Sequence, residues 1–585
     1  SLCYQVPALL LPGITLVVSP LISLMQDQVK SLNEAGIHAA YINSSLTEGQ
    51  INKALSFAAR GVYKIIYVAP ERLETASFLS FALHTPISMV TVDEAHCISQ
   101  WGQDFRPSYL KIIDFVEQLP GNPIISAFTA TATEVVKNDI ARILKLKNPN
   151  VVVTGFDREN LYYQVEHLTG KQKDIFIQNY IETHPNESGI IYCATRKNVD
   201  TLYEKLLKQG VSVTRYHAGM SNDIRKKSQD DFIYDRAQVV IATNAFGMGI
   251  DKSNVRFVIH YNMPQSMENY YQEAGRAGRD GEPAKCILLF STQDVMISKL
   301  LLGSKDFEGM DFQEIEQVKH QDSRRLQLME GYCMTTSCLR NYILKYFGET
   351  THQPCDNCGN CHQEFEELDM TLDAKWVVGC ITEMRGRYGQ ALAIGTLLGS
   401  KKARLKDIGA TSYNCYGQLE NRTEADLRLL ISQMIRMGYI TQTEGEYSVL
   451  KAGNIADLQN KNTKIIIKKF KEKEKISTTK KHKTPFKKDS FSASTESSST
   501  DSTATNFSHN SALFEALRQL RLQIAKEESV PPYIVFTDRT LIDMCSKLPQ
   551  NEDEMLNVSG VGQNKLKKYG QRFLQEISAF QSADH

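Results

Sequence analysis

Met89-Val-Thr-Val-Asp-Glu-Ala-His96 joins a short apolar run directly to two carboxylates, and this combination indicates the class of fold. A strand that ends in Asp-Glu is typical of nucleotide hydrolases, in which one carboxylate holds Mg²⁺ and the other activates the attacking water. We therefore expect Asp93 to hold Mg²⁺, Glu94 to act as the catalytic base, and His96 to belong to the same catalytic group. The alternative is an exposed acidic turn, which four residues could form by chance.

Similar apolar runs recur on both sides of this segment, from Ile14 to about Phe290, with helical stretches between them. This alternation is typical of α/β domains with doubly wound parallel sheets. The span is too long for one such sheet, and the stretch from Lys145 to Asn160 is rich in Asp and Asn. We therefore expect two tandem α/β domains, at residues 1–150 and 151–298. The predicted strands are residues 15–18, 64–68, 89–92, 124–125, 190–192, 239–242, 255–259 and 286–289.

The arginine motif, Gln272-Glu-Ala-Gly-Arg-Ala-Gly-Arg-Asp-Gly281, supports the hydrolase interpretation. Glycines beside Arg276 and Arg279 let the guanidinium groups approach a phosphate closely. Arginines supplied across a cleft stabilise phosphoryl transfer, with an effect of roughly 10³ to 10⁵ in rate. A solvated basic turn is the alternative. Two domains that each hold half of an ATPase site imply a cleft that closes on ATP.

Length, composition and charge exclude several classes of protein. The 585 residues suggest about four domains, and no apolar run reaches the roughly eighteen residues that a membrane helix needs. Lys plus Arg and Asp plus Glu balance at 67 each, which excludes a uniformly basic protein that coats nucleic acid. Twelve cysteines in a chain without an export signal favour the cytoplasm, where closely spaced cysteines more often bind metal than form disulfides.

Seven segments match, in order, the motifs of superfamily 2 helicases, and in detail the chain resembles the bacterial RecQ family from end to end. The segments are residues 17–28, 67–73, 128–133, 191–196, 216–219, 242–251 and the arginine motif. The resemblance implies that the two α/β domains are RecA-like. It also implies an ATP-dependent helicase that unwinds DNA in the 3′-to-5′ direction during repair and recombination, with a place in the response to DNA damage.

The piece most specific to RecQ is the coupling loop, residues 97–109, which directly follows the acidic motif at residues 93–96. Aromatic side chains on such a loop can stack on single-stranded bases, at roughly 1 to 3 kcal/mol per base. The resemblance implies that Trp101, Phe105 and Arg106 bind DNA and report its presence to the ATP site. Aromatic residues at this spacing are otherwise more often part of a core.

Four cysteines predict a structural zinc site in a helical module at residues 299–369. Their spacing is C-x16-C-x2-C-x2-C, four thiolates can close a tetrahedral site, and the set resembles the RecQ zinc site. Cys333 is close enough to compete, but its neighbours match a position that does not bind zinc in the family. The expected ligands are Cys338, Cys355, Cys358 and Cys361.

Residues 370–455 predict a winged helix. Apolar residues recur with helical spacing from Leu427 to Ile435, with Thr423 as the N-cap and Gly438 as the stop. Two short runs then flank a turn signal at Glu444-Gly445, as in a hairpin. In the family this domain (RQC) engages duplex DNA, but its sequence here is generic and nominates no single residue.

The remaining residues predict a disordered linker and a small helical bundle. Residues 456–510 are dominated first by Lys and then by Ser and Thr, with few apolar residues to support a core. Residues 511–585 are amphipathic and resemble the family's C-terminal helical domain (HRDC). There Tyr533 could stack on bases and Lys565 could contact phosphates, although lysines on a helix are usually a solvated face.

The start of the chain departs from the family pattern. The family's phosphate loop, G-x-G-K-[ST], would end at Ser1, so that Ser1 offers a hydroxyl to Mg²⁺ and ATP while the glycines and the lysine would precede it. We expect an N-terminally truncated sequence of a complete gene. Residues 1–585 alone are expected to bind single-stranded DNA but to hydrolyse almost no ATP.

Two alternative functions stay open at this point. An RNA-directed superfamily 2 helicase would share the acidic motif, but the four cysteines, Trp101 and the terminal bundle argue against it. A non-catalytic DNA-binding or annealing protein would follow if the truncation were real. The expected partners are single-stranded DNA and duplex junctions, on the nucleoid, and bacterial relatives imply a contact with single-strand-binding protein.

Overall fold

The computed structural model describes residues 2–100, 102, 105–185, 187–246, 252–304, 312–350, 353–363, 365–443, 449–455, 464–470, 506–528 and 530–583. The chain divides into two compact units. The first contains residues 1–333, 338–359 and 506–585, and the second contains residues 334–337 and 360–505. Among the described residues, no helix combines the length and the apolar character needed to cross a membrane.

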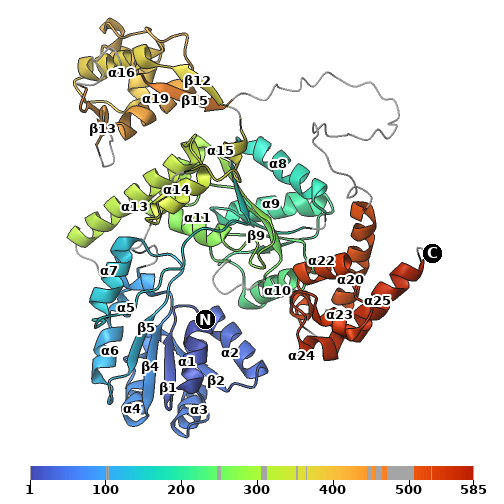
Figure 1. Cartoon of the computed structure of the whole chain (residues 1–585). Helices are drawn as coiled ribbons and strands as arrows, with labels where there is room; N and C mark the ends of the chain where they lie inside the picture. Colours follow the sequence, from blue (N-terminus) through green and yellow to red (C-terminus); the bar gives the residue numbers. More distant parts are fainter. Residues whose placement is uncertain are drawn as a thin grey trace. The chain divides into compact units, whose positions relative to one another are not determined.

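The first α/β domain is a five-stranded parallel sheet in the order β2-β3-β1-β4-β5 (Figure 1). Neighbouring residues of its central strands point into two different cores: Leu16 and Val18 pack on one face, and Val17 packs with Tyr67 on the other. Both faces are therefore covered, as expected for a parallel sheet. The strands are β1 Ile14–Val18, β2 Ala39–Ile42, β3 Ile65–Val68, β4 Ile87–Val92 and β5 Ile124–Ala127; the helices are α1 Leu2–Leu10, α2 Ile22–Glu34, α3 Glu48–Ala59, α4 Ala76–His84, α5 Pro107–Leu110, α6 Ile112–Gln118 and α7 Glu134–Ile143.

The second α/β domain is a six-stranded parallel sheet in the order β6-β11-β10-β7-β9-β8. Helix α7 ends at Ile143 and β6 begins at Leu161, so each sheet is built from its own stretch of chain, and the predicted pair of tandem α/β domains is confirmed. The strands are β6 Leu161–His167, β7 Ser188–Tyr192, β8 Val213–Tyr216, β9 Val239–Ala242, β10 Val255–His260 and β11 Ala284–Phe290; the helices are α8 Gly170–Thr183, α9 Arg196–Lys208, α10 Asn222–Ile233, α11 Met267–Ala274 and α12 Thr292–Gly303.

The cysteine-rich module contributes α13 (Phe312–Met334), α14 (Leu339–Tyr346) and the short α15 (Gly359–His362). Helix α14 contacts β6 and α11 of the second α/β domain. It therefore lies against the strand that opens this domain and the helix that leads into the arginine motif.

The second unit has the elements expected of a winged helix. Thr423 caps α19 through a capping box with Asp426, and Gly438 follows the helix with a positive φ of 78°. The hairpin β13–β14 forms as predicted, although Glu444-Gly445 lies outside the described residues. The elements are β12 Phe365–Asp369, α16 Thr371–Glu383, α17 Gln390–Leu397, α18 Ala403–Asp407, α19 Glu424–Arg436, β13 Ile440–Gln442, β14 Leu450–Ala452 and β15 Ile466–Phe470.

Strand β15 corrects the prediction of a linker that is disordered throughout residues 456–510. It pairs antiparallel with β12, so β12 also belongs to this unit rather than to a zinc module that ends at residue 369. Ile465 and Ile467 are buried in the core of the unit. Burial of these apolar side chains orders a segment that lysines otherwise dominate. Residues 471–505 lie outside the described residues.

The terminal segment forms the predicted helical bundle, although its first helix begins at Asn506 rather than at residue 511. Phe536 and Phe573 are fully buried in its core. The helices are α20 Asn506–Glu528, α21 Pro532–Val535, α22 Asp538–Lys547, α23 Glu552–Leu556, α24 Gln563–Lys565 and α25 Gln571–Ala583.

Candidate active site

Asp93 and Glu94 lie directly after β4, at the carboxyl end of the first parallel sheet, where open α/β sheets bind their ligands. The Asp93 N–H donates to the Val18 carbonyl at 2.9 Å, and the Tyr109 hydroxyl donates to the Asp93 carbonyl at 3.1 Å. Glu94 adopts a left-handed backbone with φ 48°. Such strain in a residue other than glycine clusters at functional sites, and here it turns the chain sharply after the strand.

Within the acidic motif His96 is buried and Asp93 and Glu94 are half-buried, and the motif contacts the residues that follow β5. Burial raises the pKa of Asp93. His96 is 3% exposed, and its Nδ1 lies 3.3 Å from Glu94 Oε2 and 2.9 Å from the hydroxyl of Thr129, which follows β5. The structure therefore brings together the three residues predicted from the sequence. It adds Thr129, which lies in the motif segment 128–133 and to which the sequence analysis assigned no role, as a partner of His96.

Ser1, the remaining residue predicted to face Mg²⁺ and ATP, lies outside the described residues, as does the end of the helicase motif at residues 247–251. Helix α1 begins directly after Ser1. Tyr4 on this helix is buried against Tyr67 and Phe128, with ring centroids 6.5 and 5.4 Å away. The start of the chain is thus packed on the first sheet.

The two arginines of the arginine motif differ in environment. Arg279 is exposed, whereas Arg276 is 5% exposed and lies beside the Tyr192 hydroxyl at the carboxyl end of β7. Both follow α11 in the second α/β domain. Arg279 is thus accessible to a phosphate ligand, while Arg276 is held against the sheet.

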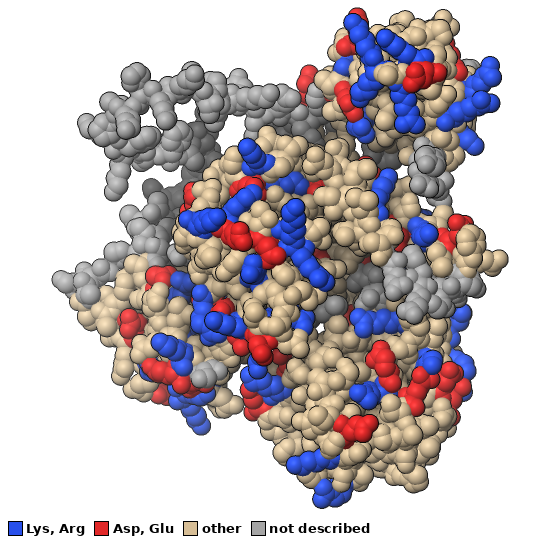
Figure 2. Space-filling model, turned by 180° about the vertical axis from the view of Figure 1, so that it is seen from behind, with Lys and Arg blue, Asp and Glu red and all other residues tan. Residues whose placement is uncertain are grey.

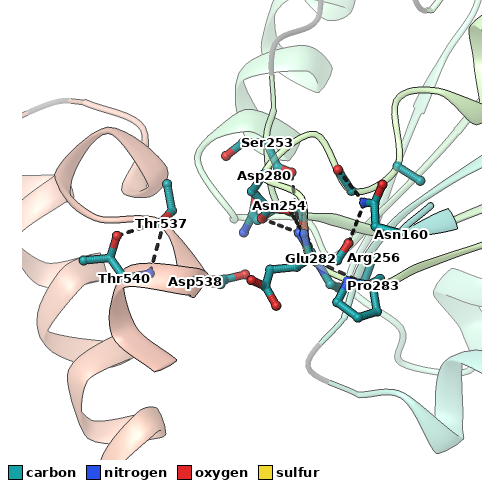
Figure 3. Close-up of polar contacts among 12 residues, drawn as sticks. Asn160, Ser253, Asn254, Arg256, Asp280, Glu282, Pro283, Thr537, Asp538 and Thr540 are labelled. Atoms are coloured by element: carbon teal, nitrogen blue, oxygen red, sulfur yellow. Dashed lines mark hydrogen bonds and ion pairs between the residues drawn. The ribbon is translucent and has the colours of Figure 1, made fainter. Parts of the chain in front are cut away.

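Two polar side chains that the sequence analysis missed hold the backbone of the arginine motif. Asn160 donates to the carbonyls of Gly278 and Glu282, both at 2.8 Å (Figure 3). Arg158 donates to three carbonyls at 3.1 to 3.2 Å, which are those of Gly275, Ala277 and Gly278. Both side chains come from the segment before β6, more than a hundred residues before the motif, so no local pattern could have identified them.

The coupling loop packs directly on the acidic motif. The Arg106 N–H donates to the Cys97 carbonyl at 2.9 Å, and the Arg106 guanidinium donates to the Pro20 carbonyl at 3.2 Å. Gly102 has no room for a side chain, because an added Cβ would lie 2.1 Å from the His96 carbonyl oxygen. A movement of this loop would therefore displace the acidic motif.

Helix α13 reaches the same loop from the cysteine-rich module. Arg325 donates to the Gly102 carbonyl at 2.9 Å and pairs with the buried Asp322 at 3.3 Å. Of the predicted DNA-binding aromatics, Phe105 is half-buried and Trp101 lies outside the described residues. The loop is thus held from two directions, by the acidic motif and by α13.

The four predicted cysteine ligands converge. Backbone N–H groups of Asn341 and Asn357 donate to the sulfurs of Cys338 and Cys355, at 3.5 and 3.4 Å. Cys333 is buried at the end of α13 and, within the described part of the chain, stands outside this group. The cluster, whose sulfur atoms all lie within 4.8 Å of one another, consists of Cys338, Cys355, Cys358 and Cys361. This arrangement fits a tetrahedral thiolate site for Zn²⁺.

The two residues predicted to bind DNA in the terminal bundle are partly covered. Tyr533 is half-buried in α21. Lys565 packs over the Phe536 ring, 5.6 Å from its centroid, and burial lowers the pKa of its ammonium group. The neighbouring Lys568 pairs with Glu528 at 2.6 Å. The bundle therefore offers fewer accessible cations than its lysine content suggests.

The second unit has an exposed basic surface, and Figure 2 shows several blue side chains gathered on its body at the upper right. Its exposed residues include Lys401, Lys402, Arg404 and Lys406, in and just before α18. The sequence analysis left the DNA contacts of this domain unassigned, because its sequence is generic and nominates no single residue.

Comparisons with known proteins span the chain. Five family models match in succession: DEAD/DEAH box helicase at residues 1–138, helicase conserved C-terminal domain at 172–281, RecQ zinc-binding at 292–362, RQC domain at 364–476 and HRDC domain at 510–577. The ATP-dependent DNA helicase RecQ of Bacillus subtilis (strain 168) is 42% identical over 580 residues, which cover 99% of this chain and 91% of the relative. The protein of the same name from Haemophilus influenzae is 37% identical over 575 residues, which cover 98% of this chain and 88% of the relative.

Proposed function

The chain belongs to the RecQ family of ATP-dependent DNA helicases, and on that basis we propose that it moves 3′-to-5′ along single-stranded DNA and separates the duplex ahead. It is an ATP-driven DNA helicase with structural zinc. The observation that best supports the assignment of the motor is the acidic pair at the carboxyl end of β4, where the strained Glu94 turn leads into the coupling loop.

Each half of the ATPase site has a distinct task in this proposal. Asp93 and the Ser1 hydroxyl would hold Mg²⁺, Glu94 accepts a proton from the attacking water, and His96 orients the Glu94 carboxylate. Arg276 and Arg279 would neutralise the charge that develops on the transferred phosphoryl group. Because Ser1 matches the last position of the phosphate loop, turnover should be measured on a chain that includes the whole loop.

Zinc would be held by Cys338, Cys355, Cys358 and Cys361, and its role would be structural. A site closed by four protein thiolates leaves no position for water or substrate, which is the arrangement of structural rather than catalytic zinc.

The proposed domain boundaries are those expected from the sequence with two changes: β12 and β15 join the winged helix, and the terminal bundle begins at Asn506.

The DNA contacts are divided among three parts of the chain. Trp101, Phe105 and Arg106 of the coupling loop would bind the single strand beside the ATP site. The exposed basic residues in and before α18 would contact duplex phosphates, which give sequence-independent and salt-dependent affinity. Tyr533 and Lys565 would add a further single-strand contact in the terminal bundle.

A strand-separation assay tests the proposed direction. A chain with the whole phosphate loop should unwind a labelled duplex with a 3′ single-stranded tail when ATP is present, and should not unwind the same duplex with a 5′ tail. Unwinding of the 5′-tailed duplex alone would contradict the proposed polarity. Equal activity on an RNA duplex would favour the RNA-directed alternative, and binding without ATP-dependent unwinding would favour the annealing alternative.

The cellular setting follows from the same proposal. A helicase of this kind would act on forks and junctions of the nucleoid in the cytoplasm, during DNA repair and recombination. Single-strand-binding protein is a proposed partner, because unwinding produces the single strands that it covers. Co-purification of the two proteins after crosslinking would test this contact.

A further inference from the structure

A short segment, residues 156–161, connects the cysteine-rich module to the arginine motif, and Arg158 is its central residue. The Arg158 Nη1 donates to the Gly275 carbonyl at 3.2 Å, and Nη2 donates to the Ala277 and Gly278 carbonyls, each at 3.1 Å. One planar guanidinium thus satisfies three backbone carbonyls of the arginine motif, a task that its rigid fork of donors suits.

These three carbonyls flank the two arginines that face the phosphates in the proposed function. Helix α11 ends at Ala274, so the carbonyls that follow lack partners within the helix. The Gly278 carbonyl also accepts from the Gly281 N–H at 3.1 Å, while Arg158 donates to the Gly275 and Ala277 carbonyls. The turn is also tight: Gly278 has a positive φ of 55°, and an added Cβ would lie 2.7 Å from the Glu282 carbonyl oxygen. The direction in which Arg276 and Arg279 leave the backbone therefore depends on the donors that hold this turn.

Two further residues support the far side of the same turn. Asn160 donates to the Gly278 and Glu282 carbonyls at 2.8 Å, and Arg256 on β10 pairs with Asp280 directly after Arg279 (Figure 3). These contacts hold the end of the motif. Arg158 supplies a different contact, because one guanidinium bridges the carbonyl of Gly275, before Arg276, and the carbonyl of Gly278, before Arg279.

The segment around Arg158 is itself held by α14 of the cysteine-rich module. Arg340 is 4% exposed and donates to the Asp157 carboxylate at 2.5 Å and to the Arg158 and Leu161 carbonyls, each at 2.6 Å. Phe156 stacks on Phe347 with ring centroids 4.3 Å apart. The position of Arg158 is thus set by a buried charge and a ring stack from the module.

We propose that Arg158 is a positioning residue for ATP hydrolysis, which orients Arg276 and Arg279, and that Arg340 holds Arg158 in place for this task. The inference rests on the proposed function. It implies that the cysteine-rich module helps to position the arginines of the ATPase site through a continuous series of contacts. The chain of contacts runs from Arg340 through residues 156–161 to the arginine motif.

The variant Arg158→Ala, in a chain with the whole phosphate loop, tests the proposal. We expect kcat for DNA-stimulated ATP hydrolysis to fall about 10- to 100-fold, because small misplacements of catalytic groups cost factors of this size. The KM for ATP should change less than about threefold, since the loss is confined to the transition state. Arg158→Lys should not restore kcat, because an ammonium group cannot span three carbonyls. Arg236→Ala is the matched control: Arg236 pairs with Asp231 in the same domain.

A double-mutant cycle separates positioning from a general loss of structure. If Arg158 acts through the motif, Arg158→Ala should lower kcat less in an Arg279→Ala background than in the wild type, because only Arg276 is then left to be misplaced, and Arg340→Ala should lower it little further in an Arg158→Ala background. The proposal would be overturned if the fold-decreases in kcat of the two single variants simply multiplied in the double variant of either pair. It would also be overturned if Arg158→Ala had the same kcat as Arg236→Ala. Should Arg158→Ala fail to fold, Arg158→Gln and Arg158→Lys enter the same cycle. A wild-type protein without DNA-stimulated hydrolysis would instead contradict the proposed function, and the inference with it.

Discussion

Among single residues, those of the acidic motif combine strain, burial and a shared partner. Glu94 keeps a left-handed backbone, and its carboxylate faces His96, which also contacts the loop after β5. This arrangement fixes the direction of the carboxylate before a nucleotide arrives. Preorganised groups of this kind cost no reorganisation at the moment of reaction.

In a chain with the whole phosphate loop, the variant Glu94→Gln should lower kcat for ATP hydrolysis by about 10²- to 10⁴-fold, because an amide cannot accept the proton of the attacking water. Glutamine has nearly the same shape, so Tm and the affinity for ATP should change little. Steady-state hydrolysis and equilibrium binding of a fluorescent ATP analogue measure the two effects. Glu134→Gln, at an exposed glutamate in the first turn of α7, is the control. Turnover of Glu94→Gln at the level of this control would remove Glu94 from the catalytic role.

The residues of the acidic motif were predictable from the sequence, and the tasks of the residues that support the acidic and arginine motifs were not. Asp93, Glu94 and His96 occupy one short motif after a predicted strand. Thr129 lies in the motif segment 128–133 and hydrogen-bonds with His96, whereas Arg158 lies outside every quoted motif and makes three hydrogen bonds to carbonyls of the arginine motif. Any residue with a suitable donor or acceptor could occupy such a position, so only its place in the fold reveals its task.

Among the helices and strands, those that the sequence analysis missed in the two α/β domains share one property. The strands β2, β6 and β8 all lie at the edges of their sheets, whereas every interior strand was predicted. An edge strand has one neighbour instead of two and is less completely buried, so its sequence is less uniformly apolar. The partly exposed strand β8 is an example.

Zinc is expected to support the folding of its module before it supports any chemistry. Structural zinc sites can contribute on the order of 10 kcal/mol to folding. The variant Cys358→Ser should therefore lose bound zinc and show reduced expression and a lower Tm. Elemental analysis and thermal unfolding are the measurements, and Cys545→Ser, at a buried cysteine of the terminal bundle, is the control that should keep its zinc. Purified wild-type protein without zinc would contradict the assignment.

The coupling loop should transmit DNA binding to the ATP site. In a chain with the whole phosphate loop, the variants Trp101→Ala, Phe105→Ala and Arg106→Ala should lose stimulation of hydrolysis by DNA and retain the slow hydrolysis seen without it, because each removes a proposed DNA contact and leaves Asp93 and Glu94 unchanged. Hydrolysis rates with and without single-stranded DNA measure the effect, and Phe57→Ala on α3 is an aromatic control in the same domain. Normal stimulation in both Trp101→Ala and Phe105→Ala would make these aromatics core residues.

Across the whole molecule, the net charge is balanced, but the exposed positive charges are distributed unevenly among the domains. The winged helix has an exposed basic surface around α18, while charges of the terminal bundle, such as Lys568 and Glu528, pair with each other. Affinity for DNA phosphates therefore depends on where cations gather at the surface and not on the net charge of the chain.

The triple variant Lys401→Ala, Lys402→Ala, Arg404→Ala should weaken binding of forked duplex DNA. Each lost phosphate contact reduces the slope of log affinity against log salt by about 0.9, so the slope should fall by up to about 3. Fluorescence anisotropy over a range of salt concentrations measures this. The control removes three exposed lysines of the first α/β domain: Lys30, Lys53 and Lys147. Equal slopes in the two variants would place the duplex contact elsewhere.

Spacing along short stretches of chain was enough to predict the two parallel sheets, the acidic and arginine motifs, the four cysteines and the cap of α19. Other features arose only when the chain folded. Strand β15 forms in a lysine-rich stretch because Ile465 and Ile467 are buried in the core of the second unit. Arg158 donates hydrogen bonds to carbonyls more than a hundred residues away in the chain. Long-range contacts of this kind depend on which apolar surfaces and backbone carbonyls the fold leaves without partners, and no local pattern encodes that.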